Sequence, residues 1–409
     1  MIIPNGPWTP PRAAMTPTPR RPRRLVFAGE AIVDVLMRVP GLPPRGGDLL
    51  ATSSQVTVGG GFNVMAAAAR QGLPVLYAGG HGTGPWGDLV RAALTAEGIG
   101  LLRPPDPSRD TGFDVALVEP DAERTFVTSL GAESASEPGS WDPVPADPGD
   151  AVYVSGYGLV PPGSGPVLAA WASALPDGVV LFLDPGPLVG QIPPESLDPV
   201  LARCDWLSCN AREATLLSAD ATPEHAATRL LTRAARANVI VRAGPDGCFL
   251  ALRAPAADEP RPGAANEPRP QPPRAPASPA PPALPAPLAP PTQQALSTSP
   301  GWPAPLSPPA PPAQQALSTS PGRPAPDAFS GHVQDSSRPV HLTAPAVHAV
   351  DTTGAGDAHS GVFLAALADG LSAADAARRA NAAAALAVTR PGPATSPDRA
   401  ELDTWLARR

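Results

Sequence analysis

Hydrophobic residues along this chain gather in short runs rich in β-branched side chains, and alanine-rich stretches of helical length lie between the runs. Because strands and helices alternate and the strands are almost continuously apolar, the pattern predicts an α/β fold with a mostly parallel sheet covered by helices on both faces. The runs predict strands at 25–28, 75–78, 152–155, 179–183, 206–208 and 239–241. The stretches between them predict helices near 62–71, 87–97, 165–174, 211–218 and 223–236.

Two segments interrupt this alternation of strands and helices. Residues 33–58 and 111–130 contain β-type runs at 55–58, 113–118 and 125–128, which are joined by turns and not by helices. We expect antiparallel strands that stand off the main sheet. Such strands would form a small β lid over a ligand bound at the sheet edge.

A low-complexity segment separates a strand-like run at 248–252 from another at 340–342. Of the 61 prolines, 25 lie between Pro255 and Pro326, and the sequence QQALSTSPG occurs twice in that interval. A Pro/Ala segment of this kind has too few apolar side chains to offset the entropy of ordering. We interpret it as a tolerated surface insertion between two strands that could form a hairpin. A ligand for a proline-binding domain is the alternative.

The domain organisation follows from these boundaries. We predict a disordered tail at residues 1–23 and a disordered Pro/Ala-rich insertion at residues 253–339. The folded domain is then expected to comprise 24–252 and 340–409, which is enough chain for one well-buried α/β core.

The composition excludes several classes of protein. All 30 basic residues are arginine, so a Walker A loop, a protein-kinase active site and a pyridoxal-phosphate Schiff base, which need lysine, are excluded. The net charge of −7 argues against a nucleic-acid partner. The three cysteines show no metal-binding or disulfide spacing, and no apolar run resembles an export signal or a membrane span. We expect a cytoplasmic protein without a membrane partner.

The strongest local signal for chemistry is the sequence DTTGAGD at 351–357, followed by a helical stretch to Asp369. Gly354 and Gly356 allow a tight turn that presents bare N–H groups, and the positive end of the next helix points at the same place. A carboxylate at Asp357 within this anion cradle suggests a base that takes a proton from a nucleophile attacking a phosphate. A plain helix cap is the alternative.

Two glycine-rich turns give weaker signals. GGGFN at 59–63 would let a ligand approach the backbone before a helix, and Asn63 offers an amide to hydroxyl groups. The sequence at 82–87 matches the dinucleotide fingerprint G-x-G-x-x-G, but its strand is not the first of the sheet and the expected acidic residue does not follow. We therefore do not favour a Rossmann dehydrogenase.

Polar residues and glycines also follow several predicted strands. The carboxyl ends of parallel strands form the ligand-binding edge of an open α/β sheet. Asn210 and Glu213, three residues apart at a helix start, could orient Mg²⁺ through water, and a capping box is the alternative. The residues beyond predicted strand ends are Asp34, Gly156, Asp184, Asn210 and Gly244.

Four segments resemble a known family. GGGFN, NAREATLL, VRAGPDGCFL and DTTGAGDAHSGVFLAAL occur in the order found in the PfkB, or ribokinase-like, family of carbohydrate kinases. The resemblance covers roughly residues 24–252 and 340–405, and its closing motif is specific. The pieces GEAIVDV, ALVEPDAERTF, SGYGL and LDPGPLVGQIP are most similar to bacterial PfkB-type sugar kinases of poorly defined substrate. The resemblance implies a ribokinase-like fold with a small β lid.

The resemblance also implies a role for each matching residue. Asp357 matches the catalytic base, and Gly354, Ala355 and Gly356 match the anion hole for the transferred phosphoryl group. Asp34, Gly60 and Asn63 match positions that hold sugar hydroxyls. Asn210 and Glu213 match the NxxE motif tied to Mg²⁺ and phosphate, whereas Gly244 and Asn381 fall near the nucleotide. Asp351, Thr353, Ala387, Gly392 and Ser396 align with a loop that binds a monovalent cation such as K⁺ in some members.

These matches lead us to expect ATP-dependent phosphorylation of a monosaccharide or sugar acid. The alternatives are a nucleoside kinase of the same family and a catalytically silent sugar- or nucleotide-binding regulator, and a homodimer is left open. Few aromatic residues surround the expected pocket, which favours a sugar over a nucleobase. Arg124 in the lid could meet a sugar carboxylate or be a solvated strand charge. The departures from the family pattern are Ile32, Met65 and His359, and they put the sugar's identity in doubt more than catalysis.

Overall fold

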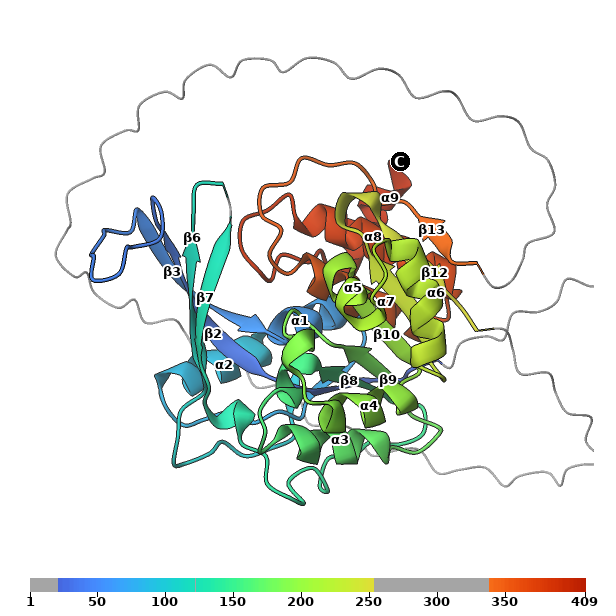
Figure 1. The fold of residues 1–409 in the computed structure, drawn as a ribbon, viewed down its shortest axis with the longest axis horizontal. Helices are drawn as coiled ribbons and strands as arrows, with labels where there is room; N and C mark the ends of the chain where they lie inside the picture. The colour runs from blue at the N-terminus through green and yellow to red at the C-terminus, as the bar shows by residue number, and fades with distance from the viewer. Residues whose placement is uncertain (1–20, 122, 254–337) are drawn as a thin grey trace, which may run out of the picture. The chain divides into compact units, whose positions relative to one another are not determined.

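The central sheet of the protein has nine strands within the part of the chain that the computed structural model describes, residues 21–121, 123–253 and 338–409 (Figure 1). Its order is β13-β12-β11-β10-β9-β8-β1-β4-β5, and all neighbours from β11 to β5 pair in parallel. This confirms the mostly parallel sheet. The strands are β1 (Leu25–Ala28), β4 (Val75–Tyr77), β5 (Gly100–Leu101), β8 (Ala151–Ser155), β9 (Val180–Asp184), β10 (Trp206–Asn210), β11 (Asn238–Arg242), β12 (Cys248–Ala251) and β13 (Val340–Leu342).

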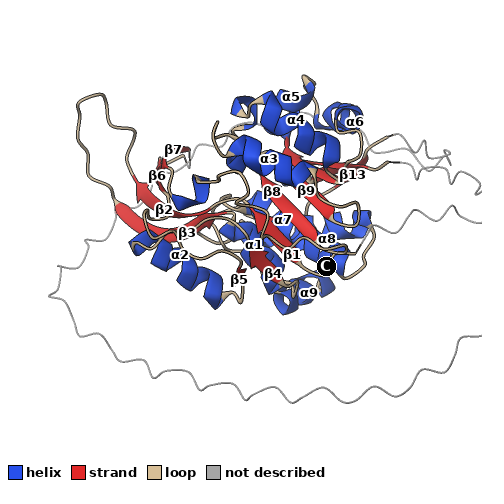
Figure 2. Ribbon diagram, turned by 90° about the horizontal axis from the view of Figure 1, so that it is seen from below, coloured by secondary structure: helices blue, strands red, loops and turns tan. Residues whose placement is uncertain are grey.

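Helices cover both faces of this sheet (Figure 2). Successive side chains of a strand point to opposite faces. Phe27 and Tyr153 therefore join one hydrophobic cluster with α1, α2, α7 and α8, whereas Val26 and Val152 join another with α3 to α6. The helices are α1 (Phe62–Arg70), α2 (Pro85–Ala96), α3 (Gly165–Ser173), α4 (Pro194–Arg203), α5 (Ala211–Ser218), α6 (Pro223–Arg233), α7 (Ala355–Ala368), α8 (Ala373–Ala387) and α9 (Arg399–Ala407).

A second sheet of four strands contains the two segments that interrupt the alternation. Its order is β3-β2-β6-β7, with β2 (Ala31–Arg38), β3 (Ser53–Gly60), β6 (Phe113–Val118) and β7 (Arg124–Ser129). The prediction of antiparallel strands is wrong for the central pair, because β2 and β6 run parallel. Parallel pairing needs a long crossover. Here the chain between β2 and β6 passes through β3, α1, β4, α2 and β5.

The predicted hairpin partners on either side of the Pro/Ala-rich segment do pair. β12 and β13 are antiparallel, with Cys248 opposite Leu342 and Leu250 opposite Val340. The segment itself lies outside the described residues, as does most of the predicted tail at 1–23. The pairing shows that the two halves of the folded chain share one sheet.

Replacing residues 257–335 with a short Gly/Ser turn is expected to leave Tm and kcat nearly unchanged. The two strand ends that the segment joins are already neighbours, and closing a shorter loop costs about 0.6 kcal/mol less for each halving of its length. Thermal unfolding and an ADP-release assay would check this. A loss of several degrees, or of most of kcat, would show that the segment packs on the domain or gates its site.

Some elements differ from the sequence predictions. α4 was not predicted, because its sequence carries prolines at 194 and 199, and only a proline in the first turn is easily tolerated. α6 ends at Arg233, three residues before the predicted end. Asp34 lies in the middle of β2 and not beyond a strand end. Within the described ranges, no helix is both long and apolar enough to span a bilayer.

Candidate active site

The loop before α7 turns tightly at a glycine and leads directly into a helix. Gly354 has a φ of 72°, in the left-handed region that favours glycine, and a Cβ on it would lie 2.1 Å from the carbonyl oxygen of Pro393. Only glycine fits there without a shift of the backbone. The helix that follows has 14 residues, and the N–H groups of its first turn have no partner within the helix. The local geometry therefore agrees with the predicted anion cradle at 354–356.

Asp357 lies in this first turn and receives a hydrogen bond from a distant helix. Nδ2 of Asn63, in α1, donates to Oδ2 of Asp357 at 3.0 Å. Burial raises the pKa of Asp357 to about 6, although the Asn63 hydrogen bond opposes the rise. A carboxyl with this pKa is largely ionised at neutral pH and can still accept a proton. Two residues that the sequence singled out separately are thus brought together.

Arg242 places a buried positive charge beside the anion loop, and sequence reasoning missed it. Its guanidinium donates to Asp184 at 2.8 Å and to Ser208 at 2.5 Å, and lies 3.7 Å from Glu213. A Cβ on Gly356 would be 3.4 Å from this guanidinium. The carboxylates raise the pKa of Arg242 despite its burial, so the group stays charged. The only sequence signal is its place at the end of β11.

The NxxE pair forms the capping box that was the plain alternative. The side chain of Asn210 accepts a hydrogen bond from the backbone N–H of Glu213 at 2.9 Å. In return, the Glu213 carboxylate accepts from the backbone and side chain of Asn210 at 2.8 and 2.7 Å. Burial raises the pKa of Glu213. Each oxygen of the Glu213 carboxylate thus accepts one hydrogen bond within the capping box, and the orientation of Mg²⁺ through water by this pair stays a prediction.

The loop aligned with a monovalent-cation site is organised around a different cation. Oδ1 of Asp351 accepts from the backbone and hydroxyl of Thr353 at 2.9 and 2.7 Å, and Oδ2 accepts from Gly392 at 3.1 Å. Arg124 of β7 forms an ion pair with the same carboxylate. The interpretation of Arg124 as a solvated strand charge is therefore wrong, and its pairing with Asp351 argues against a contact with a sugar carboxylate.

This arrangement does not fit K⁺. The guanidinium of Arg124 already supplies the positive charge, and the carbonyl of Ala387 accepts from Thr395 at 3.0 Å. Ser396 uses its carbonyl to accept from Arg70. Over the described residues, no group of three or more His, Cys, Asp and Glu side chains is placed to hold a metal ion.

The residues assigned to the nucleotide differ in their surroundings. Gly244, in the turn after β11, has a φ of 59° and open space where a Cβ would lie, which leaves room for a ligand. Asn381 of α8 is buried and donates to the carbonyl of Leu342 at 2.8 Å, so it ties α8 to β13.

His359 is buried on α7, and burial lowers its pKa to about 3. It is therefore neutral and takes no part as a base at neutral pH.

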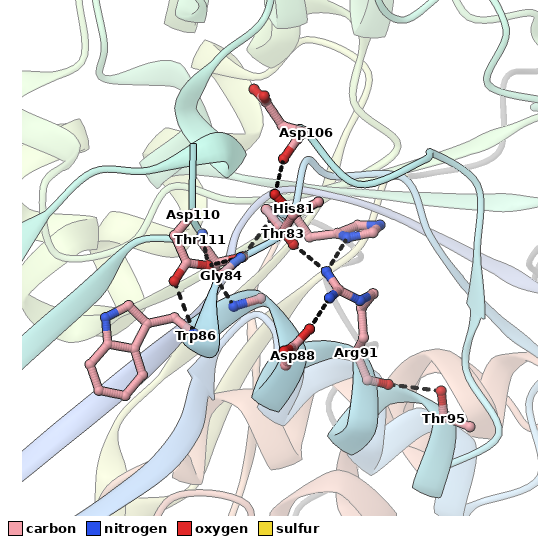
Figure 3. A network of polar contacts seen from close by, with 12 residues as sticks. His81, Thr83, Gly84, Trp86, Asp88, Arg91, Thr95, Asp106, Asp110 and Thr111 are labelled. Carbon is pink, nitrogen blue, oxygen red and sulfur yellow. Dashed lines mark hydrogen bonds and ion pairs between the residues drawn. The ribbon is translucent and has the colours of Figure 1, made fainter. Parts of the chain in front are cut away.

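The dinucleotide-like turn at 82–87 is filled by a carboxylate from the same chain (Figure 3). Asp110 accepts hydrogen bonds from the backbone N–H groups of Gly84, Trp86 and Gly87 at the start of α2, at 2.8 to 3.1 Å. These are the donors that a pyrophosphate would need. The structure thus agrees with the choice against a Rossmann site.

Comparison with known proteins agrees with this geometry. The family model described as pfkB family carbohydrate kinase matches residues 22–262 and 330–400. The chain is 34% identical over 193 residues to the uncharacterized sugar kinase YegV of Escherichia coli (strain K12). That match covers 47% of this chain and 59% of the relative, so the chain spans about three fifths of the relative's length.

Solved structures show the fold. Ribokinase from Thermotoga maritima superposes with a TM-score of 0.62 at 20% identity, covering 94% of this chain and 99% of that one. Arabidopsis thaliana ribokinase, solved with ribose and ATP, gives the same TM-score, identity and coverage. The predicted ribokinase-like fold, with a mostly parallel sheet and a second small sheet, is confirmed.

Proposed function

The chain belongs to the pfkB family of carbohydrate kinases, and we propose that it transfers the γ-phosphoryl group of ATP to a hydroxyl of a small carbohydrate. One observation carries the proposal. Asp357 stands in the first turn of α7, next to the glycine anion loop, and is held by Asn63. A carboxylate with a raised pKa beside a site for phosphate oxygens suits deprotonation of an attacking alcohol.

In the proposed reaction, a substrate hydroxyl oxygen attacks the γ-phosphorus while the carboxylate of Asp357 accepts the hydroxyl proton. The bond between the γ-phosphorus and the oxygen that bridges to the β-phosphorus breaks, and ADP leaves. Asn63 orients the base through the 3.0 Å hydrogen bond to Oδ2, which leaves Oδ1 for the substrate. The proposal therefore needs no further residue to orient the carboxylate of Asp357.

Charge on the transferred group would be met by two features of the chain. The N–H groups at the start of α7 point at the phosphoryl position, and the guanidinium of Arg242 lies beside Gly356. Mg²⁺ would neutralise phosphate oxygens and arrive with ATP, because this ion keeps several waters and needs few protein ligands. Asn210 and Glu213 would then act by holding Arg242 and the start of α5.

The substrate would lie between this loop and the four-stranded lid. Asp34 of β2 is only 8% exposed, and burial, with Asp114 and Asp357 nearby, raises its pKa to about 8. Gly60 ends β3 and is followed by Gly61, the N-cap residue of α1. A closed lid would exclude water from the transfer.

Asp34→Ala is expected to reduce kcat/KM for the true sugar by at least about tenfold, with little change in KM for ATP. Removing a buried group that pairs with substrate hydroxyls leaves those hydroxyls unsatisfied, which costs about 1 to 3 kcal/mol. The measurement is ADP release over a panel of sugars, sugar acids and nucleosides.

Asp48→Ala is the matched control, because Asp48 is an exposed carboxylate of the β2–β3 connection in the same lid. It should leave both KM values unchanged. Unaltered sugar kinetics in Asp34→Ala, or a nucleoside as best acceptor, would contradict the sugar pocket. Absence of ADP release with every acceptor would favour a silent regulator.

A further inference from the structure

A row of polar side chains crosses the lid sheet. Thr57, Asp34, Asp114 and Thr128 are paired in register on β3, β2, β6 and β7. Residues directly opposite each other on neighbouring strands point to the same face of a sheet. The two carboxylates therefore stand side by side, on strands about 5 Å apart. Asp114 was not singled out by the sequence.

The chain makes space for this row. A Cβ on Gly59 would lie 2.0 Å from Oδ2 of Asp34, so the carboxylate of Asp34 lies directly over the backbone of β3. Asp34 and Asp114 are only 8% and 7% exposed. Val33 and Phe113, the preceding residues on each strand, face the other way and contact the hydrophobic core. The two aspartates, which we call the acidic row, thus face away from this core.

Two free polar atoms near this row are hydrogen-bond acceptors. Oδ1 of Asp114 and Oδ1 of Asn63 are buried and have no hydrogen-bond partner among the described residues. Oε2 of Glu30 is also buried without a partner, but burial raises the pKa of Glu30 to about 8, so this carboxyl is largely protonated at neutral pH. Asn63 has already used its amide N–H on Asp357, so only its acceptor remains. Buried acceptors without partners are costly, and a ligand that brings donors would satisfy them.

Positive charge is absent from the same place. Within the described ranges, no ion pair joins an arginine or histidine to Asp34, Asp114 or Glu30, and the charges that act on Asp34 are those of Asp114 and Asp357. The two arginines described at the candidate site form ion pairs with other carboxylates, Arg124 with Asp351 and Arg242 with Asp184. Burial raises the pKa of Asp114 only to about 6, so its carboxylate is largely ionised at neutral pH, whereas Asp34, with a pKa of about 8, is largely protonated. An anionic substrate would therefore meet the charge of Asp114 on this side and no cation.

We infer that the proposed substrate site beside this row takes a carbohydrate without an anionic group, a neutral or amino sugar, and that Asp114 acts with Asp34 to reject sugar acids and phosphorylated sugars. The inference rests on the proposed function, since it concerns the acceptor of that same site. Hydroxyl and ammonium groups donate to the free acceptors. Carboxylate and phosphate oxygens only accept, and they would be repelled by the ionised carboxylate of Asp114.

The test is an ADP-release panel in which several pentose and hexose skeletons are each offered as neutral sugar, amino sugar, sugar acid and terminal phosphate. The best neutral or amino sugar is expected to exceed the acid and the phosphate of its own skeleton by at least about a hundredfold in kcat/KM. A sugar acid or a sugar phosphate as best acceptor would overturn the inference while leaving the proposed kinase function intact.

Asp114→Asn tests the residue itself, because it keeps the side chain's size while removing its charge and replacing one acceptor with a donor. We expect KM for the neutral or amino sugar to rise by at least about tenfold, with KM for ATP unchanged. The ratio of kcat/KM for that sugar to kcat/KM for the acid of the same skeleton should fall by at least about tenfold. The control is Asp48→Asn, the same change at an exposed carboxylate of the lid. An unchanged preference in Asp114→Asn would show that Asp114 does not select the substrate.

Calorimetric titration of the full chain with the same panel, in the presence of ADP, separates binding from turnover. Binding of neutral or amino sugars without ADP release from ATP would support the pocket and contradict the kinase function. Tighter binding of the acids, or no binding of neutral and amino sugars, would overturn the pocket inference whatever the activity.

Discussion

Asp357→Asn is expected to lower kcat by about 10² to 10⁴-fold while ATP affinity changes by no more than a few fold. The amide has nearly the shape of the carboxylate and can still accept the hydrogen bond from Asn63, but it cannot take a proton at any relevant pH. The loss should therefore fall on the chemical step. Single-turnover ADP formation and a separate titration with ATP would measure the two quantities.

The pH profile supplies the control for this substitution. Because the pKa of Asp357 is raised to about 6, the ionised base is present above that pH and is lost as the pH falls through it. The wild-type kcat/KM should decline toward tenfold per pH unit below about pH 6. The residual activity of Asp357→Asn should lack this decline. More than about a tenth of wild-type kcat in the variant would contradict the base assignment.

Arg242→Met is expected to cost about 3 to 5 kcal/mol of unfolding free energy. The guanidinium is 2.8 Å from Asp184 and 3.7 Å from Glu213, and the side chains of both ion pairs are only 3 to 13% exposed. Removing it would leave two carboxylates buried side by side without a counter-charge. Urea unfolding followed by circular dichroism would measure the loss.

Arg378→Met provides the matched control. Arg378 also pairs with an aspartate, Asp375, at 2.7 Å, but the two side chains are 58% and 59% exposed. An exposed pair contributes little, so this variant should lose less than about 1 kcal/mol. A similar loss in both variants, or a loss under about 1 kcal/mol in Arg242→Met, would show that the Arg242 cluster does not hold the sheet edge together.

Much of the fold was predictable because its determinants are local. The strands at 25–28 and 206–208 and the helices at 62–71 and 211–218 follow from hydrophobic runs and their spacing, and the structure confirms them within a few residues. α4 and the parallel pairing of β2 with β6 were not predictable in this way. Two prolines obscure the helical pattern of α4, and the direction in which two strands pair depends on the chain that connects them.

In the candidate site, too, the features that could be predicted are those with local determinants. The sequence by itself determined the glycine turn and the carboxylate within it, because glycines 354 and 356, the helix start and Asp357 are neighbours in the chain. It also offered the capping box at Asn210 as one of two interpretations, because its two partners are three residues apart. In each case, backbone geometry over one helical turn decides the arrangement.

Only the tertiary structure decided which distant side chains meet. Asn63 lies 294 positions from Asp357, and Arg124 lies 227 positions from Asp351, yet each pair is in contact. The acidic row of the lid likewise joins strands that are separated by a crossover. The residues that neighbour an arginine or aspartate in the sequence do not reveal whether its side chain faces water, a substrate or an opposite charge. Its partner and its burial, which set its pKa and its role, arise only when the sheets bring their strands together.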